Sequence, residues 1–307
     1  MNNKIIVIGS SNVDLIMKME RLPEKGETIT DADFVQTFGG KGANQAVGAA
    51  RAGGEVTFIN CVGDDAYTPQ MVQNLERDGL DMQYVFREKG IASGHALIMI
   101  GDAGNNYLSV APGANYRLTP ARIDQASAAF DQAAIIIMQY EIPADTVQYV
   151  MQKAEELSIP VLWNFAPARD FDLSYLSKVT ILVVNETEAE FLCGQKVQSV
   201  AEAEQAAQQL AARGVTHVVI TLGEKGAYFS DANESFHVPA FLVETVDTTA
   251  AGDVFCGALA VARVEQKSMK EAIRFASAAA ALAVTKLGAQ PSVPQREEIN
   301  KFLDQHS

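Results

Sequence analysis

Short runs rich in β-branched residues alternate with helical patterns along most of this 307-residue chain, and this alternation restricts the fold more than any other feature. Six runs have the composition and flanking residues of buried strands: 4–9, 56–62, 134–139, 161–165, 181–185 and 218–222. Nine stretches have helical spacing: 41–52, 67–77, 120–130, 144–157, 186–192, 200–213, 251–265, 269–286 and 295–303. The pattern predicts an α/β fold with a mainly parallel central sheet covered on both faces by helices.

Two regions interrupt this alternation. Residues 16–38 contain two β-prone pieces, and residues 94–100 and 107–110 have the pattern of a hairpin around the turn 101–106. We expect both regions to join in a small accessory sheet that acts as a lid over the strand ends, where α/β proteins bind their ligands. A surface decoration without a function is the alternative.

No Pro/Gly/Ser-rich linker, low-complexity tract or internal repeat marks a second independent domain in this sequence. We therefore predict a single domain over residues 1–307. Two segments of that domain, at about 12–40 and 93–112, are expected to form the lid.

The balance of charge limits the partners that the chain can bind. It carries 24 basic and 38 acidic residues, a formal net charge of −14, which argues against a nucleic-acid or anionic-membrane surface. It is compatible with binding a single nucleotide, because a few backbone amides and a bound cation can hold phosphates locally. No stretch approaches the ~18 uncharged apolar residues of a membrane span.

The cysteines and histidines provide no framework for a disulfide or a metal. Cys61, Cys193 and Cys256 are far apart and odd in number, which fits a reducing cytoplasm. The four histidines are scattered, so we do not expect a histidine-built metal site. The apolar run near the N-terminus is too short for a secretory signal peptide.

The segment 246–255, with the sequence VDTTAAGDVF, joins a run of small residues to the start of a helix. Unsatisfied N–H groups and the positive end of the helix dipole make such a start an anion site. Asp253 lies in the first turn, where its carboxylate can accept a proton from a hydroxyl that attacks phosphorus. The segment alone leaves two interpretations open: the centre of a phosphoryl-transfer enzyme, or an aspartate that caps a helix.

A second glycine-rich segment, 39–46, has the sequence GGKGANQA. Its three glycines let a ligand approach the backbone, and Lys41 and Asn44 add a cation and an amide on one helical turn. The segment lacks the spacing of a Walker loop, and the absence of a GxGxxG fingerprint disfavours an NAD-dependent enzyme. It suits a hydroxyl-rich ligand such as a sugar; a tight turn without a ligand is the alternative.

Polar residues also follow several of the predicted strands, and each has a simple structural interpretation. Asn12 and Asp14 suit a polar turn, Glu141 a first-turn acid of the next helix, and Asn185 with Glu188 a capping box. Their joint placement at the ends of successive strands instead favours a ligand site. Asn12 and Asp14 would then hold hydroxyls, Asn185 and Glu188 a hydrated Mg²⁺ or phosphates, and the loop 221–226 would lie along a nucleotide.

In order and spacing, these segments resemble the ribokinase (phosphofructokinase-B-like) family of ATP-dependent sugar and nucleoside kinases. GGKGANQA at 39–46 and VDTTAAGD at 246–253 are similar to the two signatures of that family. Four intermediate stretches also match: 112–115, 166–169, 185–188 and 288–292. The resemblance covers essentially the whole chain and implies a ribokinase-like three-layer α/β/α domain with a small β-sheet lid.

The resemblance implies a reaction, the transfer of a phosphoryl group from ATP to the 5-hydroxyl of D-ribose. Asp253 would be the general base, and Ala250, Ala251 and Gly252 would form the anion hole. The implied sugar ligands are Asn12, Asp14, Gly40, Lys41, Asn44, Glu141 and Asp253. The implied nucleotide contacts are Asn185, Glu188, Thr221, Gly223, Gly226, Gly252 and Ser277.

The resemblance also implies two cations and a partner. Mg²⁺ would accompany the ATP phosphates near Asn185 and Glu188, and a monovalent cation such as K⁺ would order the anion-hole loop. The implied ligands of the monovalent cation are Asp247, Thr249, Ala283, Lys286, Gly288 and Ser292, several of them through backbone carbonyls. The family pattern further implies a homodimer in which the lid sheets pair.

The chain departs from the family pattern at a few positions. Val254 and Cys256 stand where Thr and Asn are common, and Ser277 stands where His or Asn often meets the adenine. These differences concern nucleotide affinity and sugar preference rather than the reaction. The competing interpretations are a kinase for 2-deoxyribose, fructose or a nucleoside, and a non-catalytic sensor of a sugar or a nucleotide.

Overall fold

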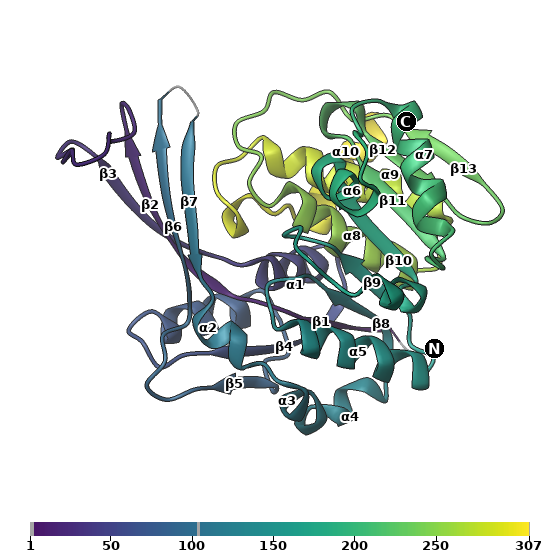
Figure 1. Cartoon of the computed structure of the whole chain (residues 1–307), viewed down its shortest axis with the longest axis horizontal. Coiled ribbons are helices and arrows are strands. Elements are labelled where there is room, and N and C mark those ends of the chain that lie inside the picture. The colour runs from purple at the N-terminus through teal and green to yellow at the C-terminus, as the bar shows by residue number, and fades with distance from the viewer. Residues whose placement is uncertain (1–2, 103–104, 307) are drawn as a thin grey trace.

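The computed structural model describes residues 3–102 and 105–306, and in that part of the chain a nine-stranded sheet lies between two layers of helices (Figure 1). The strands follow the order β13-β12-β11-β10-β9-β8-β1-β4-β5. They are parallel from β11 to β5, and β12 and β13 are added antiparallel at one edge. Their bounds are Lys4–Ile8 (β1), Glu55–Val62 (β4), Val85–Arg87 (β5), Ala133–Met138 (β8), Val161–Asn164 (β9), Ile181–Asn185 (β10), His217–Thr221 (β11), Ala227–Ser230 (β12) and Ser235–Val238 (β13).

Alternate residues of the central strands face opposite helical layers, which is why these strands are apolar throughout. In β1, Ile5 and Val7 belong to the core on one face, and Ile6 and Ile8 belong to the core on the other. The first face is covered by α1 (Lys41–Arg51), α2 (Thr68–Arg77), α8 (Ala251–Val264), α9 (Met269–Val284) and α10 (Arg296–Gln305). The second is covered by α3 (Pro120–Gln125), α4 (Ser127–Phe130), α5 (Ala144–Glu156), α6 (Glu186–Cys193) and α7 (Val200–Ala211).

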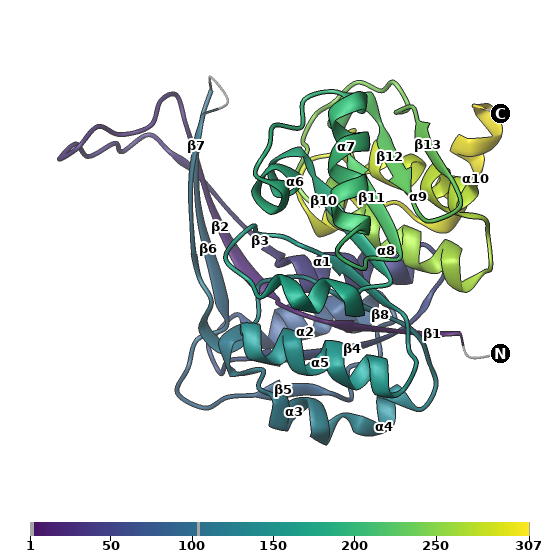
Figure 2. The same cartoon turned by 45° about the vertical axis from the view of Figure 1, so that its right-hand side comes forward.

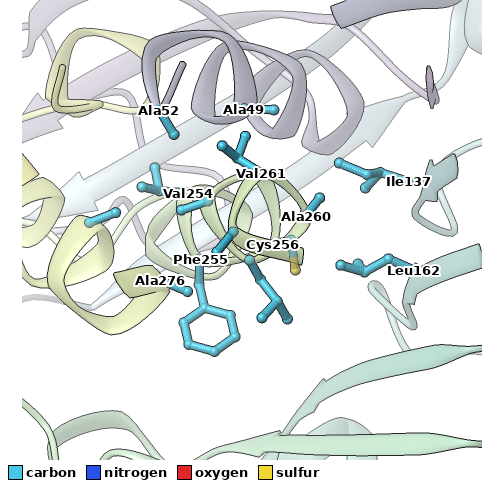
Figure 3. Close-up of a cluster of buried hydrophobic side chains, with 14 of the residues drawn as sticks. Ala49, Ala52, Ile137, Leu162, Val254, Phe255, Cys256, Ala260, Val261 and Ala276 are labelled. Carbon is cyan, nitrogen blue, oxygen red and sulfur yellow. The ribbon is translucent and has the colours of Figure 1, made fainter. Parts of the chain in front are cut away.

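Helix α8 is the central helix of the first face, and residues 253–262 of it are all buried. Figure 3 shows its side chains between Ala49 of α1, Ala276 of α9, and the strand residues Ile137 and Leu162. Val254 and Cys256, which depart from the family pattern, belong to this core. Small residues let the helices approach closely: a methyl group on Gly257 would lie 2.6 Å from the backbone nitrogen of Ala49.

A separate four-stranded sheet stands beside the main body and extends away from it (Figures 1 and 2). Its order is β3-β2-β6-β7, and its strands are β2 (Asn12–Met19), β3 (Asp33–Gly39), β6 (Gly94–Gly101) and β7 (Asn106–Ala111). Only three residues separate β1 from β2, so Asn12 lies both near the carboxyl end of β1 and at the base of this second sheet.

The predicted fold class and the separate small sheet are confirmed, and the predicted strands and helices end within about two residues of the observed ones. Three short strands, β5, β12 and β13, were not predicted. The helix predicted over 120–130 is divided at Ala126, where the backbone leaves the helical region (ψ 13°). Ala103 and Gly104 of the predicted turn lie outside the described residues. No helix of the described part is long and apolar enough to cross a membrane.

The close approach of α1 and α8 predicts a graded effect of adding methyl groups between them. Gly257→Ala would force a Cβ against backbone atoms of α1, and overpacking of this kind costs about 1–3 kcal/mol. Gly48→Ala is the matched control, since its Cβ would meet the Cα of Val254 at 3.3 Å and a helical alanine gains about 1 kcal/mol over glycine. Thermal unfolding should show a melting temperature several degrees lower for G257A than for G48A; equal melting temperatures would contradict the close contact.

Candidate active site

Polar residues gather at one edge of the central sheet, where the parallel strands β1, β8, β9, β10 and β11 all have their carboxyl ends. Ligands of open α/β sheets bind at this edge, because side chains from several strand ends and the first turns of the following helices converge there. The residues at these ends are Ser10, Ser11 and Asn12 after β1, Gln139 and Glu141 after β8, Asn164 in β9, Asn185 in β10 and Thr221 in β11.

The start of α8 lies at the same edge and has the backbone geometry of an anion site. Ala250 precedes the helix in the left-handed conformation (φ 62°), which is unfavourable for a residue with a Cβ and is concentrated at functional sites. The N–H groups of Gly252 and Asp253 have no hydrogen-bond partner within the described residues, whereas the N–H of Ala251 donates to the carbonyl of Thr248 at 3.3 Å. The first turn therefore offers free donors at the positive end of the helix dipole.

The carboxylate of Asp253 is buried (5% exposed) and is held by two side-chain amides from α1. Asn44 Nδ2 donates to Oδ2 at 3.0 Å, and Gln45 Nε2 donates to Oδ1 at 2.9 Å. Neither oxygen accepts a hydrogen bond from its own helix within the described chain, so the carboxylate is not the cap of α8. Burial raises the pKa of Asp253 above its usual value, and the charge of Lys41 and the two amides oppose that rise.

Asn12 and Asp14, at the base of the small sheet, are both buried and point to the same side of β2. Asn115 Nδ2 donates to Asn12 Oδ1 at 2.8 Å, which leaves the Nδ2 of Asn12 as a donor without a partner in the described chain. Burial, together with the charges of Glu141 and Asp253, raises the pKa of Asp14 to about 7. The pair therefore presents one amide donor and one titratable acceptor.

Glu141 binds the start of α1, not the start of the helix that follows it in sequence. Its Oε2 accepts hydrogen bonds from the hydroxyl of Ser10 at 2.5 Å and from the backbone N–H of Lys41 at 3.0 Å. The interpretation of Glu141 as a first-turn acid of its own following helix, α5, was therefore wrong: Asp145 is the acid in the first turn of α5. Because β8 lies next to β1, the end of β8 comes beside the loop that leads into α1.

The glycines of the segment 39–42 are required by the chain itself. A Cβ on Gly40, whose φ is +89°, would lie 2.7 Å from the Cα of Ser11, and one on Gly42 would lie 2.4 Å from the nitrogen of Ser10. A Cβ on Gly39 would lie 2.2 Å from Oδ2 of Asp14. The tight packing of α1 on the β1–β2 turn thus places Lys41 and Asn44 near Asn12 and Asp14.

A cavity of about 190 Å³ opens in front of the first turn of α8. Its lining includes the following predicted site residues: Lys41, Asn185, Glu188, Thr221, Ala250, Ala251, Gly252 and Asp253. Gly223, Gly226 and Ser277, the other predicted nucleotide contacts, do not belong to this lining. The backbone itself requires a glycine at position 226, because the φ of Gly226 is +98° and a Cβ there would lie 2.0 Å from the carbonyl oxygen of Val238.

Asn185 and Glu188 form the capping box that their spacing predicts. Asn185 Oδ1 accepts from the N–H of Glu188 at 2.8 Å, and Glu188 Oε2 accepts from the N–H of Asn185 at 2.9 Å. Burial raises the pKa of Glu188, although the hydrogen bond from Asn185 and the charge of Lys41 oppose the rise. The two residues line the cavity as well, so the capping and ligand interpretations are compatible.

Lys41 is the cation at the centre of this acidic site. Burial disfavours its charge, but the carboxylates of Asp253, Glu141 and Glu188 outweigh that effect and raise its pKa. Its Nζ makes no hydrogen bond or ion pair within the described residues, and it lines the cavity beside the first turn of α8. A charged, unpaired ammonium group therefore remains free for an anionic ligand.

Two loops behind the first turn of α8 are joined by Asp247. Its Oδ1 accepts from the N–H and the hydroxyl of Thr249, at 2.9 Å and 2.6 Å, and its Oδ2 accepts from the N–H of Gly288 at 2.9 Å. These hydrogen bonds hold the pKa of Asp247 below its usual value although burial acts against them. Asp247, Thr249 and Gly288, three of the predicted monovalent-cation ligands, are thus brought together.

The remaining predicted ligands of that cation make contacts of their own in the described structure. The carbonyl of Ala283 accepts from the N–H of Lys286, and the Nζ of Lys286 pairs with Glu298 at 2.9 Å. The buried hydroxyl of Ser292 donates to the carbonyl of Ala289 at 2.8 Å. No group of three or more His, Cys, Asp or Glu side chains suited to a metal occurs among the described residues.

Several contacts of the site were missed by sequence reasoning, although some of the residues lie inside quoted motifs. Ser10 donates a hydrogen bond to Glu141, and Asn115 donates one to Asn12. The buried amides of Gln139, Gln45 and Asn164 are joined by hydrogen bonds, and Gln45 also donates to Asp253. Two adjacent polar residues, Asn44 and Gln45, interrupt the otherwise apolar buried part of α1, and this is the signal that could have indicated the role of Gln45.

Comparison with known proteins identifies the family of the chain. Residues 2–296 match the model of the pfkB family of carbohydrate kinases. The chain is 38% identical to the ribokinase of Haemophilus influenzae over 304 residues (99% of each chain) and 38% identical to the deoxyribokinase of Salmonella typhi over 300 residues (97% of this chain, 98% of the other). The structure of Arabidopsis thaliana ribokinase complexed with ribose and ATP superposes with a TM-score of 0.92 at 34% identity, covering 99% of both chains. The chain therefore belongs to the pfkB family of carbohydrate kinases.

Proposed function

We propose that this protein transfers the γ-phosphoryl group of ATP to the 5-hydroxyl of D-ribose. The observation that carries the proposal is the position of Asp253. Its buried carboxylate is held by two side-chain amides, and it lies in the first turn of a helix whose start has free N–H donors. Full-length similarity to the ribokinase of Haemophilus influenzae supports ribose as the acceptor.

In the proposed reaction, the oxygen of the 5-hydroxyl attacks the γ-phosphorus in line while its proton passes to Asp253. The bond between the γ-phosphorus and the β–γ bridging oxygen breaks, and ADP leaves. The N–H groups of the Ala250–Gly252 turn and the ammonium group of Lys41 stabilise the charge on the transferring group. The N–H of Gly252 is free for this role, whereas that of Ala251 must first leave the carbonyl of Thr248. The residues proposed to surround the sugar hydroxyls are Asn12, Asp14, Gly40, Lys41, Asn44, Glu141 and Asp253.

The charge of the site supports a requirement for Mg²⁺ with the ATP. The carboxylates of Asp253, Glu141 and Glu188 all act on the ammonium group of Lys41, so bare triphosphate would meet net negative charge. Both oxygens of Glu188 already accept hydrogen bonds from Asn185, which suits contact with a hydrated ion better than direct ligation. When bound, Mg²⁺ would neutralise charge on the phosphates near Asn185 and Glu188.

A monovalent cation fits the loops that Asp247 joins. Asp247 and Thr249 precede the anion-hole turn directly, and Gly288 anchors the second loop to them. A cation held by Asp247, Thr249 and carbonyls of the second loop, 283–292, would fix the turn at Ala250 without touching the sugar. K⁺ is the ion that we propose for this site.

Phosphorylation of 2-deoxyribose is the second candidate function. The observation that favours it is the 38% identity, over almost the full length, to the deoxyribokinase of Salmonella typhi, which equals the identity to the ribokinase of Haemophilus influenzae. Asp14 and the free amide of Asn12 favour an acceptor with vicinal hydroxyls, and hence ribose.

We further propose that residues 1–307 form one domain in which the segments 12–40 and 93–112 act as a lid, and that two lids pair in a homodimer. Large apolar side chains are exposed on the small sheet, among them Phe34 (59%), Leu97 (54%) and Leu108 (62%). An exposed apolar sheet of this kind is typical of an interaction surface. The cysteines Cys61, Cys193 and Cys256 are unpaired in the described chain, as suits a reducing cytoplasm.

Asp253→Asn tests the proposed base. The amide keeps the shape of the side chain but cannot accept the proton, so kcat should fall by about 10²–10⁴, the usual contribution of a general base. The new NH2 group would face one of the two amide donors that now bind the carboxylate, so the variant should fold but melt at or a few degrees below the temperature of the wild type. Coupled ADP release measures the rate. Near wild-type turnover in a folded D253N protein would remove the proposed base.

The same assay identifies the acceptor when it is run over ribose, 2-deoxyribose, fructose and nucleosides. We expect the highest kcat/KM with ribose. A preference for 2-deoxyribose would select the second candidate function, and activity confined to a nucleoside would contradict both.

The raised pKa of Asp14 predicts a pH dependence of sugar binding. With a pKa of about 7 in the folded protein, Asp14 is ionised at pH 8 and mostly protonated at pH 6, and the ionised form is the stronger acceptor for a sugar hydroxyl. The Kd for ribose, measured by calorimetry, should therefore rise by about tenfold from pH 8 to pH 6. Asp14→Asn should bind more weakly with a Kd that does not change over this range; an unchanged pH dependence in this variant would assign the titration to another group.

The joined loops predict a dependence on the monovalent cation. Replacing K⁺ by tetramethylammonium should lower kcat by about 5- to 150-fold, the range of a typical coupling between two sites. Asp247→Ala should be slow in either salt, because the anchor of both loops is lost. The measurement is the steady-state rate in each salt at constant ionic strength. Equal wild-type rates in the two salts would exclude the proposed cation site.

A further inference from the structure

Three buried side-chain amides are joined by hydrogen bonds next to Asp253, and the central one, that of Gln45, donates to the carboxylate. Gln139 Nε2 donates to Gln45 Oε1 at 2.7 Å, and Gln45 Nε2 donates both to Asp253 Oδ1 at 2.9 Å and to Asn164 Oδ1 at 3.1 Å. We propose that Gln45 is a positioning residue that fixes the orientation of the Asp253 carboxylate and keeps it ready to accept a proton. The inference rests on the proposed role of Asp253 as the base.

The surroundings of Gln45 fix the direction of its amide. Gln45 is fully buried, and its Nε2 faces two oxygens, one from Asp253 and one from Asn164. Asn164 is itself oriented, because its Nδ2 donates to the carbonyl of Val183 at 3.1 Å. If the amide of Gln45 were reversed, its Oε1 would face the oxygen of Asn164 and the negatively charged carboxylate of Asp253. The repulsion between these oxygens strongly favours the observed orientation.

The packing of α1 on α8 places this amide at the base. A methyl group on Gly257 would lie 2.6 Å from the backbone oxygen of Gln45, so the absence of a side chain at Gly257 permits the distance at which Gln45 reaches Asp253. The neighbouring Asn44 donates to the other carboxylate oxygen. Two donors on two different oxygens restrict rotation of the carboxylate about its bond to Cβ.

This arrangement preserves basicity while it limits motion. An amide N–H stabilises the ionised carboxylate by a charge-assisted hydrogen bond but does not donate its proton to it. An ionised carboxylate has about four acceptor positions, and Asn44 and Gln45 occupy two of them, so a position remains for the substrate hydroxyl.

Charged and titratable groups from several elements also face Asp253. Lys41 on α1 favours its ionised form, while Glu141 after β8 opposes it. Asp14 on β2, Glu188 on α6 and Cys256 on α8 interact with the charge of Asp253 as well. Since most of these neighbours are acidic, loss of the donor from Gln45 should shift the ionisation of Asp253 toward higher pH.

Gln45→Met tests the inference, because methionine has nearly the same length but no hydrogen-bonding amide. We expect kcat to fall by about 10- to 100-fold, as for loss of a hydrogen bond to a charged group, with KM values for ribose and ATP within about threefold of wild type. The acidic limb of the kcat–pH profile should move to higher pH. A change in packing alone would lower the melting temperature without moving this limb.

Two further variants complete the experiment. Gln139→Met removes the second amide of the chain, which does not touch the carboxylate, and should shift the limb in the same direction by a smaller amount. Gln152→Met on α5, where the amide binds the hydroxyl of Tyr175, is the matched control and should change neither kcat nor the limb. If Q45M fails to fold, the shift in Q139M decides the question.

The outcomes separate this inference from the proposed function. A folded Q45M protein with kcat within twofold of wild type and an unmoved acidic limb would overturn the role of Gln45, even if Asp253→Asn is inactive. An unmoved limb in a folded Q139M, when Q45M cannot be measured, would overturn it equally. Full activity of D253N would instead remove the proposed base itself.

Discussion

The carboxylate of Asp253 is buried among other acidic groups, and the site is built around the need to keep it ionised away from water. Burial of a charge is costly unless donors and an opposite charge compensate it. Here the donors are Asn44 and Gln45 and the charge is that of Lys41, all on the first turns of α1. The placement of α1 relative to α8 therefore determines the chemistry of the site.

The position of α1 depends in turn on contacts at its N-terminal turn. Glu141 and Ser10 bind its first turn, and Gly40 and Gly42 let it press on the turn between β1 and β2. Because β2 is the first strand of the small sheet, Asn12 and Asp14 are attached to the same turn. Movement of that sheet would therefore shift Asn12 and Asp14 relative to Asp253. In the proposed function, closure of the sheet over a substrate would bring these residues into place around Asp253.

The parts of this structure that could be predicted from the sequence are those set by local pattern. Parallel strands buried on both faces give continuous apolar runs, and the Asn185–Glu188 capping box lies within four residues. The short antiparallel strands β12 and β13 lack such a pattern. Contacts between distant segments were beyond reach: Gln45 and Asp253 are 208 positions apart, and Glu141 binds α1 because β8 adjoins β1 in space. Motif resemblance supplied the residues of the site but not the amide chain behind them.

A crystal structure of the protein with ribose and a non-hydrolysable ATP analogue would test the central claim most directly, through the distances around Asp253. The account predicts that the 5-hydroxyl oxygen of ribose lies within about 3 Å of a carboxylate oxygen of Asp253, and about 3–3.5 Å from the γ-phosphorus in line with its bond to the bridging group. It also predicts γ-phosphoryl oxygens on the free N–H groups at the start of α8. A complex in which Asp253 contacts no sugar oxygen, or in which the γ-phosphoryl group lies away from that helix start, would contradict the account.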